Sequence, residues 1–358
     1  MRPHDAAING KSSNTSDGGM ALSQEKPWVL AHLSDLHLAR TAGLRLHDLH
    51  GKRLLGWLRW QLKRRFRQNE GLLTTLACEL QQNSPDHIAI TGDLCHLSLV
   101  AEFGAARDWL ASLGDPARCS LVFGNHDQYV ATDWAHSCGL LLPWLQGDAH
   151  HAPENRPAQL DTLFPLLQRR GSVALISLNS ARPTTLHLAS GKIGREQLDR
   201  LQQVLIELKG QQLFRILLLH HPPTQDTGVF SRRRGLDDGP ELRALLAEHG
   251  VELILSGHTH RSASGVLPGP HGPIPLFGAP SITSVESDEH KRSSYYLFTI
   301  CPAQDGSTGW TIAVRHRLLA ANAQAFIDGP QQCWFSPATP AKPPAKTACA
   351  GEIEQQGQ

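Results

Sequence analysis

The chain has 358 residues, of which 40% are hydrophobic, and a formal net charge of +1 at pH 7. This length and composition can bury a full core in one large domain or two, and the balanced charge removes any global case for nucleic-acid binding. The seven cysteines are scattered without a CxxC pair, which argues against a disulfide framework or a structural zinc site and favours a reducing compartment.

Neither end of the chain has the pattern of a folded element. Residues 1–26 are polar and lack the apolar segment of a signal peptide, and no run of about 18 apolar residues occurs anywhere. Residues 319–358 contain the Pro/Ala/Lys segment SPATPAKPPAKTA. We therefore expect a cytoplasmic protein with two disordered tails around a domain at 27–318.

Between the tails, short apolar runs alternate with helical patterns. Strands are predicted at 28–35, 87–93, 119–127, 173–180, 214–221 and 251–260. Helices are predicted at 70–82, 101–113, 195–209 and 240–250. Apolar runs at 273–281, 294–300 and 309–317 follow without helices between them. This order predicts a layered α/β domain whose sheet has an antiparallel edge.

Five of the predicted strands end in polar side chains that are suited to metal binding. These ends are Ser34-Asp35-Leu36-His37, Gly92-Asp93, Gly124-Asn125-His126-Asp127, His220-His221 and Gly257-His258-Thr259-His260. One such end is common by chance, and a lone histidine there is usually a satisfied polar group. Five in series are a strong signal, because ligands in open α/β sheets bind at the carboxyl ends of the strands.

The residue types indicate which ions would bind. Mixed carboxylate, imidazole and amide ligands suit Mn²⁺, Fe²⁺ or Zn²⁺, and the lack of cysteine disfavours a thiolate site. Seven side chains are too many for one catalytic ion, which keeps positions open for water and substrate. Two ions that share one carboxylate would use all seven. Such a pair clamps the attacking and leaving oxygens of an in-line displacement and lowers the pKa of bound water toward about 7.

In this order the strand ends resemble the series D-x-H, G-D, G-N-H-[DE], H and G-H-x-H of the calcineurin-like metallophosphoesterases, over about residues 28 to 318. The resemblance implies a sandwich of two mixed β-sheets flanked by helices, with a dinuclear metal centre at the strand ends. It implies one ion held by Asp35, His37 and His260, a second held by Asn125, His220 and His258, and Asp93 bridging both.

The same resemblance assigns the remaining polar residues. His126 would contact the phosphate and help to protonate the leaving oxygen, and Asp127 would orient it. His220 is preferred to His221 as the ligand because the family's histidine stands in an H-x-P frame, which His220-His221-Pro222 fits.

The family leaves the substrate open, because the same centre cleaves phosphomonoesters, diesters and pyrophosphates. We expect a phosphoric ester hydrolase in which metal-bound hydroxide attacks a small phosphodiester or phosphomonoester, since the motifs look like those of the family's bacterial cyclic-nucleotide branch. One alternative is a membrane-peripheral pyrophosphatase or phosphodiesterase on a lipid-linked substrate such as UDP-diacylglucosamine. Another is a low-activity scaffold that binds a membrane or a protein.

The segment 51–68, GKRLLGWLRWQLKRRFRQ, has seven Lys or Arg and no acidic residue. At about 100° per residue, its leucines gather on one face and most of its basic residues on the other. Two interpretations stay open: a core-packed helix with a solvated basic back, or a helix that lies on the inner, anionic face of a membrane. A nucleic-acid contact has little support.

Two further segments bear on the substrate. Arg232-Arg233-Arg234 form a basic loop that is either solvated or able to reach over the rim to a phosphate or headgroup. The segment 128–170 is longer than a simple crossover and predicts a cap near Asn125, in which Trp134 and Trp144 would stack a base or pack in the core.

Overall fold

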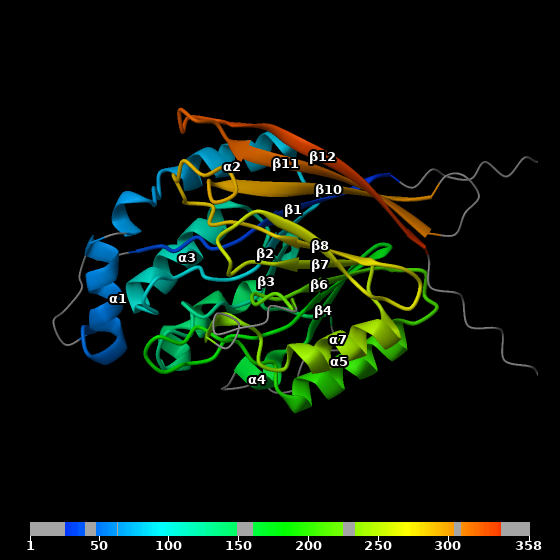
Figure 1. The fold of residues 1–358 in the computed structure, drawn as a ribbon, viewed down its shortest axis with the longest axis horizontal. Coiled ribbons are helices and arrows are strands. Elements are labelled where there is room, and N and C mark those ends of the chain that lie inside the picture. Colours follow the sequence, from blue (N-terminus) through cyan, green and yellow to red (C-terminus); the bar gives the residue numbers. More distant parts are fainter. Residues whose placement is uncertain are drawn as a thin grey trace, which may run out of the picture.

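The chain forms two mixed six-stranded sheets, seen in a computed structural model that describes residues 26–39, 48–62, 64–148, 160–224, 233–303 and 309–337 (Figure 1). The first sheet has the order β12-β11-β10-β1-β2-β3 and the second β4-β5-β6-β7-β9-β8. The strands of the first sheet are β1 (Trp28–Leu33), β2 (His87–Ile90), β3 (Cys119–Leu121), β10 (Ser294–Pro302), β11 (Gly309–Leu319) and β12 (Phe326–Pro337). Those of the second are β4 (Leu166–Arg170), β5 (Val173–Ser177), β6 (Phe214–Leu218), β7 (Leu253–Ser256), β8 (Ala263–Leu267) and β9 (Ile274–Gly278).

Each sheet has a parallel part and an antiparallel edge. Strands β1, β2 and β3 pair in parallel, and so do β5, β6, β7 and β9. The chain's last strands, β10 to β12, add an antiparallel edge to the first sheet, while β4 and β8 close the two edges of the second. The predicted fold class, two mixed sheets with an antiparallel edge, is confirmed.

Helices separate many of the strands along the chain. They are α1 (Gly51–Leu62), α2 (Leu72–Asn83), α3 (Val100–Ser112), α4 (Leu160–Leu163), α5 (Arg195–Leu208) and α7 (Gly239–His249), with short 3₁₀ turns η2 (Arg64–Phe66), η3 (Pro116–Arg118), η4 (Trp134–His136) and η5 (Cys138–Trp144). No helix in the described ranges is long and apolar enough to cross a membrane.

The second sheet is buried on both faces, which explains its continuous apolar strands. Successive β6 residues point to opposite faces, so Phe214, Ile216 and Leu218 join the core between the sheets while Leu217 joins the layer formed with α5 and α7. The one ionic residue of β6, Arg215, is buried and pairs with Glu252 at 2.8 Å. The strands that lead to His220 and His258 are thus fixed in position by packing on both sides.

One prediction about the tails is wrong. Residues 326–337, expected to be disordered, form β12, which pairs along its length with β11 and places Phe326 in the core. The domain therefore extends past residue 318. Of the two predicted tails, residues 1–25 and 338–358 lie outside the described residues.

The orientation of α1 also differs from the core-packed interpretation. Its leucines face outward, whereas Gly56 is buried and Arg53 donates to the carbonyl oxygens of Leu97 and Ser98. The helix therefore packs through its small and basic side. In Figure 1 it stands at one end of the molecule, away from the helices α5 and α7.

Candidate metal centre

The carboxyl ends of five strands meet at one place between the two sheets. The loops after β1 and β2 run side by side, since the Asp35 amide donates to the Gly92 carbonyl and the His37 amide to the Asp93 carbonyl, each at 2.9 Å. Contacts between the two sheets meet here as well: the His220 ring Nδ1 lies 2.7 Å from the Thr91 carbonyl, and the His258 amide donates to Asp35 Oδ2 at 3.1 Å. The predicted convergence of strand ends is therefore present.

The backbone at this place is strained. Five non-glycine residues of the strand ends have φ between 48° and 69°, a left-handed conformation that is uncommon for side chains other than Asn, Asp and His. They are Asp35, His37, Asp93, His258 and His260. Strain of this kind persists only where the surroundings over-determine it, and it gathers at functional sites.

Glycines let the loops approach each other closely. A Cβ on Gly124 would overlap Asp93 Oδ1, and one on Gly257 would overlap Ser34 Oγ. A Cβ on Gly92 would stand 2.9 Å from His220 Nδ1. The glycines that precede three of the motifs are thus required by the close packing of the loops.

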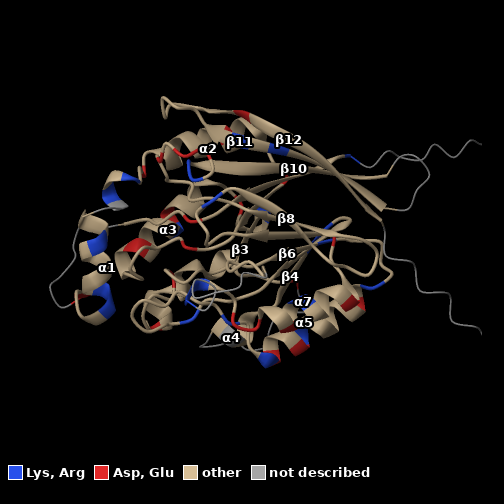
Figure 2. Ribbon diagram, in the orientation of Figure 1, with Lys and Arg blue, Asp and Glu red and all other residues tan. Residues whose placement is uncertain are grey.

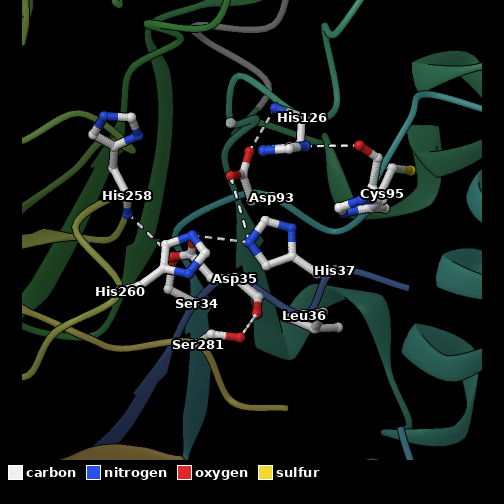
Figure 3. Close-up of polar contacts among 12 residues, drawn as sticks. Ser34, Asp35, Leu36, His37, Asp93, Cys95, His126, His258, His260 and Ser281 are labelled. Carbon is white, nitrogen blue, oxygen red and sulfur yellow. Dashed lines mark hydrogen bonds and ion pairs between the residues drawn. The ribbon is translucent and has the colours of Figure 1, made fainter. Parts of the chain in front are cut away.

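The first cluster of potential ligand atoms comes from both sheets (Figure 3). His37 Nε2 and His260 Nε2 lie 3.0 Å apart, and Asp35 Oδ1 lies 3.5 Å and 3.2 Å from them. Asp93 completes a set of four residues whose ligand atoms all lie within 4.8 Å of one another. Two carboxylates and two imidazoles at this spacing could hold one divalent ion.

The second cluster contains His220, His221 and His258. Both ring nitrogens of His221 are engaged, with Ser180 Oγ at 2.8 Å and the Ala189 carbonyl at 3.2 Å. By contrast, His220 Nε2 and His258 Nε2 are buried without a hydrogen-bond partner, and so is Oδ1 of Asn125. Buried polar atoms normally have partners, so three unpartnered atoms in one place suit the binding of a cation.

Asp93 lies between the two clusters. Its Oδ1 accepts the His126 amide at 2.7 Å, which fixes the carboxylate. Its Oδ2 has no hydrogen-bond partner and lies 3.8 Å from His37 Nε2 in the first cluster and 3.5 Å from His220 Nε2 in the second. Asp35 is held in the same way, with Oδ2 anchored by an amide and Oδ1 turned into the first cluster.

The local electrostatics favour the ligand-competent forms of most of these groups. Burial alone would raise the pKa of Asp93, but the imidazoles of His220, His126 and His37 outweigh it and hold that pKa well below the ordinary value. Burial lowers the pKa of His258 to about 3, so its ring is neutral at pH 7. His220 is the exception, because the charges of Asp93 and Asp35 overcome its burial and raise its pKa to about 9. The two carboxylates thus favour positive charge beside the His220 ring.

His126 lies beside the first cluster, with its ring 4.8 Å from that of His37. Its Nδ1 lies 2.7 Å from the His96 carbonyl, and the Tyr129 ring stacks on it at 5.3 Å. Asp127, predicted to orient His126, has a different position: its two carboxylate oxygens accept the amides of Cys95 and Gly124, each at 2.8 Å. Asp127 therefore holds the loops, and the His96 carbonyl holds the ring.

A pocket opens beside this centre. Asn125, His126, His96 and Tyr129 line it on one side, and Lys52 and Arg59 of α1 line it on another. Lys52 lies 4.3 Å over the Tyr129 ring and donates to Thr184, and burial lowers its pKa to about 8. Sequence reasoning missed His96, Tyr129 and Lys52 as members of the site, although His96 and Tyr129 each stand three residues after a predicted site residue.

Two segments were predicted to reach the substrate, the basic loop at 232–234 and the segment 128–170, and they lie at different distances from the pocket. Arg234 lines this pocket and also a second one on the His260 side, which places the described part of the 232–234 basic loop at the rim. Trp144 is buried in the core, and Trp134 packs against that core. The core interpretation of these tryptophans is therefore confirmed, and the aromatic ring next to the centre is that of Tyr129.

The sequence of the chain is similar to those of two probable phosphodiesterases. Over 184 residues the chain is 32% identical to a probable cyclic nucleotide phosphodiesterase of Synechococcus sp., covering 51% of this chain and 61% of that protein. It is 26% identical over 204 residues to a probable cyclic nucleotide phosphodiesterase of another Synechococcus strain, covering 56% and 68%. The chain thus matches about three fifths of the length of the first relative.

Solved structures share the fold at low identity. A dimetal phosphatase from Danio rerio superposes with a TM-score of 0.53 at 13% identity, over 85% of this chain and 99% of that one. A purple acid phosphatase from yellow lupin (Lupinus luteus) seeds superposes with a TM-score of 0.50 at 14% identity, over 85% and 53%. Residues 29–262, which include every motif described above, match the family described as calcineurin-like phosphoesterase. The chain therefore belongs to the calcineurin-like phosphoesterase family.

Proposed function

We propose that this protein is a phosphodiesterase that uses two divalent metal ions to hydrolyse a small phosphodiester, with cyclic nucleotides as the first substrate class to test. The observation that carries this proposal is the position of Asp93 Oδ2, without a hydrogen-bond partner and within 3.8 Å of an imidazole from each ligand cluster. A single carboxylate oxygen so placed fits a bridge between two ions.

The ligand sets follow from the two clusters. Asp35, His37 and His260 would hold one ion, and Asn125, His220 and His258 the other, with Asp93 shared. Mn²⁺, Fe²⁺ and Zn²⁺ fit these mixed oxygen and nitrogen donors. When bound, two such ions would polarise the phosphoryl oxygens and lower the pKa of a water molecule. The orphaned atoms of Asn125, His220 and His258 support His220 rather than His221 as the ligand.

His126 is the residue suited to proton transfer. Its Nδ1 lies 2.7 Å from the His96 carbonyl, so that nitrogen carries the hydrogen of the neutral ring and the ring is held in one orientation at the pocket wall. Stacking on Tyr129 restricts the ring further. We infer that Nε2 contacts the phosphate and, when protonated, donates its proton to the leaving oxygen.

The pocket wall suits an anionic substrate. Lys52, Arg59 and Arg234 line it with positive charge. The two Synechococcus relatives are named as probable cyclic nucleotide phosphodiesterases, which adds support for this substrate class.

A lipid-linked phosphoester or pyrophosphate is the second candidate. It is favoured by one observation: α1, which supplies Lys52 and Arg59 to the pocket, exposes four leucines on its other side. A substrate with acyl chains would place its phosphates in the pocket and its chains along that apolar side.

The first test is a substrate panel after reconstitution with Mn²⁺, Fe²⁺ or Zn²⁺. Bis(p-nitrophenyl) phosphate and cyclic nucleotides should be hydrolysed by the wild type, and Asp93→Asn should lower turnover by several orders of magnitude and lose at least one tightly bound ion. Near wild-type turnover of Asp93→Asn with two ions bound would refute the dinuclear model. Preference for lipid pyrophosphates over every diester would select the second candidate.

Gly124→Ala tests the packing around the bridge. The added methyl group overlaps Asp93 Oδ1, so it should displace the carboxylate and reduce metal content and activity together. Gly104→Ala in α3 is the matched control, because a methyl group there meets nothing within 4 Å and should at most stabilise the helix by about 1 kcal/mol. Metal analysis and thermal melting of both variants check this. Full metal content in Gly124→Ala would show that the carboxylate position is not critical.

His220→Ala and His221→Ala distinguish the adjacent histidines. His220→Ala should bind one ion fewer per chain, because it removes an orphaned ligand atom. His221→Ala should keep both ions and lower the melting temperature, because it removes hydrogen bonds to Ser180 and Ala189. Elemental analysis decides between them, and the opposite pattern would exchange the two roles.

His126→Ala tests the division of labour at the pocket. It keeps the backbone amide that fixes Asp93, so both ions should stay bound while turnover falls roughly 10²–10⁴-fold. The loss should be smaller for a p-nitrophenyl ester, whose leaving group needs little protonation. Comparison of two leaving groups measures this, and loss of metal in the variant would mean that His126 is a ligand.

A further inference from the structure

The outer face of α1 combines features that are seldom left exposed together. Leu54, Leu55, Leu58 and Leu62 lie within about 100° of the helical wheel, and the exposed Phe66 follows in η2. Leu62 and Phe66 are 73% and 68% exposed, and the other three about 40% each. We call these five residues the leucine face. A contiguous apolar stripe of this kind marks an interaction surface.

Two exposed arginines, Arg59 and Arg65, accompany the leucine face. The segment 51–68 contains seven Lys or Arg and no Asp or Glu. Arg59 and Arg65 are exposed beside the stripe, and the Arg65 guanidinium stacks 4.6 Å over the Phe66 ring. Figure 2 shows the Lys and Arg of α1 gathered on this end of the molecule. The surface is therefore apolar at its centre and cationic at its margin.

The body of the protein holds this surface in place. Gly56 packs so closely that a Cβ there would stand 2.7 Å from Leu97 Cδ2 and Tyr129 Oη. Arg53 donates to the carbonyls of Leu97 and Ser98, and Tyr129 Oη donates to the carbonyl of Lys52. The leucines are thus exposed because the opposite side of α1 is committed to the pocket wall.

We propose that α1 and η2 form a docking surface for an anionic phospholipid bilayer, with the leucine face inserted at the level of the headgroups. This goes beyond the proposed function and does not depend on it. The positive charge of α1 favours a membrane over a second copy of the chain as the partner. Two copies joined through α1 would bring like-charged helices together, whereas an anionic surface attracts the same residues. Leucines and phenylalanine then leave water at the boundary between headgroups and acyl chains.

The test is sedimentation of the full chain with sucrose-loaded vesicles. The wild type should bind vesicles of phosphatidylcholine that contain phosphatidylglycerol, bind pure phosphatidylcholine weakly, and dissociate in high salt. Leu58→Ser combined with Leu62→Ser should weaken the partition constant by at least about tenfold. Ile206→Ser on the exposed side of α5 is the matched control and should bind normally, since Ile206 is 54% exposed but far from α1 in the sequence and on the second sheet's outer layer.

A charge reversal separates electrostatic from apolar attraction. Arg65→Glu should weaken binding at low salt by roughly tenfold or more, whereas Arg195→Glu on α5 should change it little. None of these substitutions touches the pocket, so hydrolysis of bis(p-nitrophenyl) phosphate and the melting temperature should stay at wild-type values in all four variants. That readout distinguishes failure of docking from failure of the proposed activity.

Two outcomes would overturn the proposal. One is wild-type protein that does not sediment with anionic vesicles at low salt. The other is a dimer in sedimentation velocity that Leu58→Ser and Leu62→Ser dissociate while vesicle binding is unchanged, which would assign the leucine face to a second copy of the chain.

Discussion

The structure depends on keeping ionised carboxylates and unpartnered imidazoles buried where two sheets meet. Asp35 and Asp93 are fully buried, and each has one oxygen fixed by a backbone amide and one turned toward histidine rings. Buried charge without compensation is costly, so a fold that retains this arrangement must meet the cost with cations or protons. The unpartnered oxygen of Asp93 and the orphaned atoms of Asn125, His220 and His258 describe a site organised for positive charge.

This requirement explains the local backbone. The amides that fix the carboxylates can reach them only if the loops turn sharply at the strand ends, which gives left-handed conformations at Asp35, Asp93 and His258. It also explains why glycine precedes three of the motifs, since a Cβ on Gly124 or Gly257 would meet a carboxylate and one on Gly92 would meet the Gly124 backbone and the His220 ring. Two parallel strand sets, each buried on both sides or covered by helices, provide the rigid frame that holds this strain.

The candidate metal centre and most of the fold could be predicted from the sequence, because both follow from patterns over a few neighbouring residues. Apolar runs of the right length gave the parallel strands, and each run ends directly in its polar motif. The strand β12 was missed because it is an edge strand whose side chains are mostly exposed, so its residues show no apolar alternation. Tyr129, His96 and Lys52 were missed for another reason: their place in the pocket depends on how α1 docks, which no local pattern encodes.

The orientation of α1 shows the limit most clearly. A helical wheel separates the leucines from the basic residues, but it does not say which side faces the protein, and the usual rule would bury the leucines. The tertiary contacts reverse that rule, because the close approach at Gly56 and the carbonyl contacts of Arg53 can be made only from the small and basic side. The same approach brings Lys52 over Tyr129, and Tyr129 onto His126. Exposure of the leucine face is therefore a consequence of building the pocket wall, and one short helix lies between the Tyr129 and His126 rings and the outer surface.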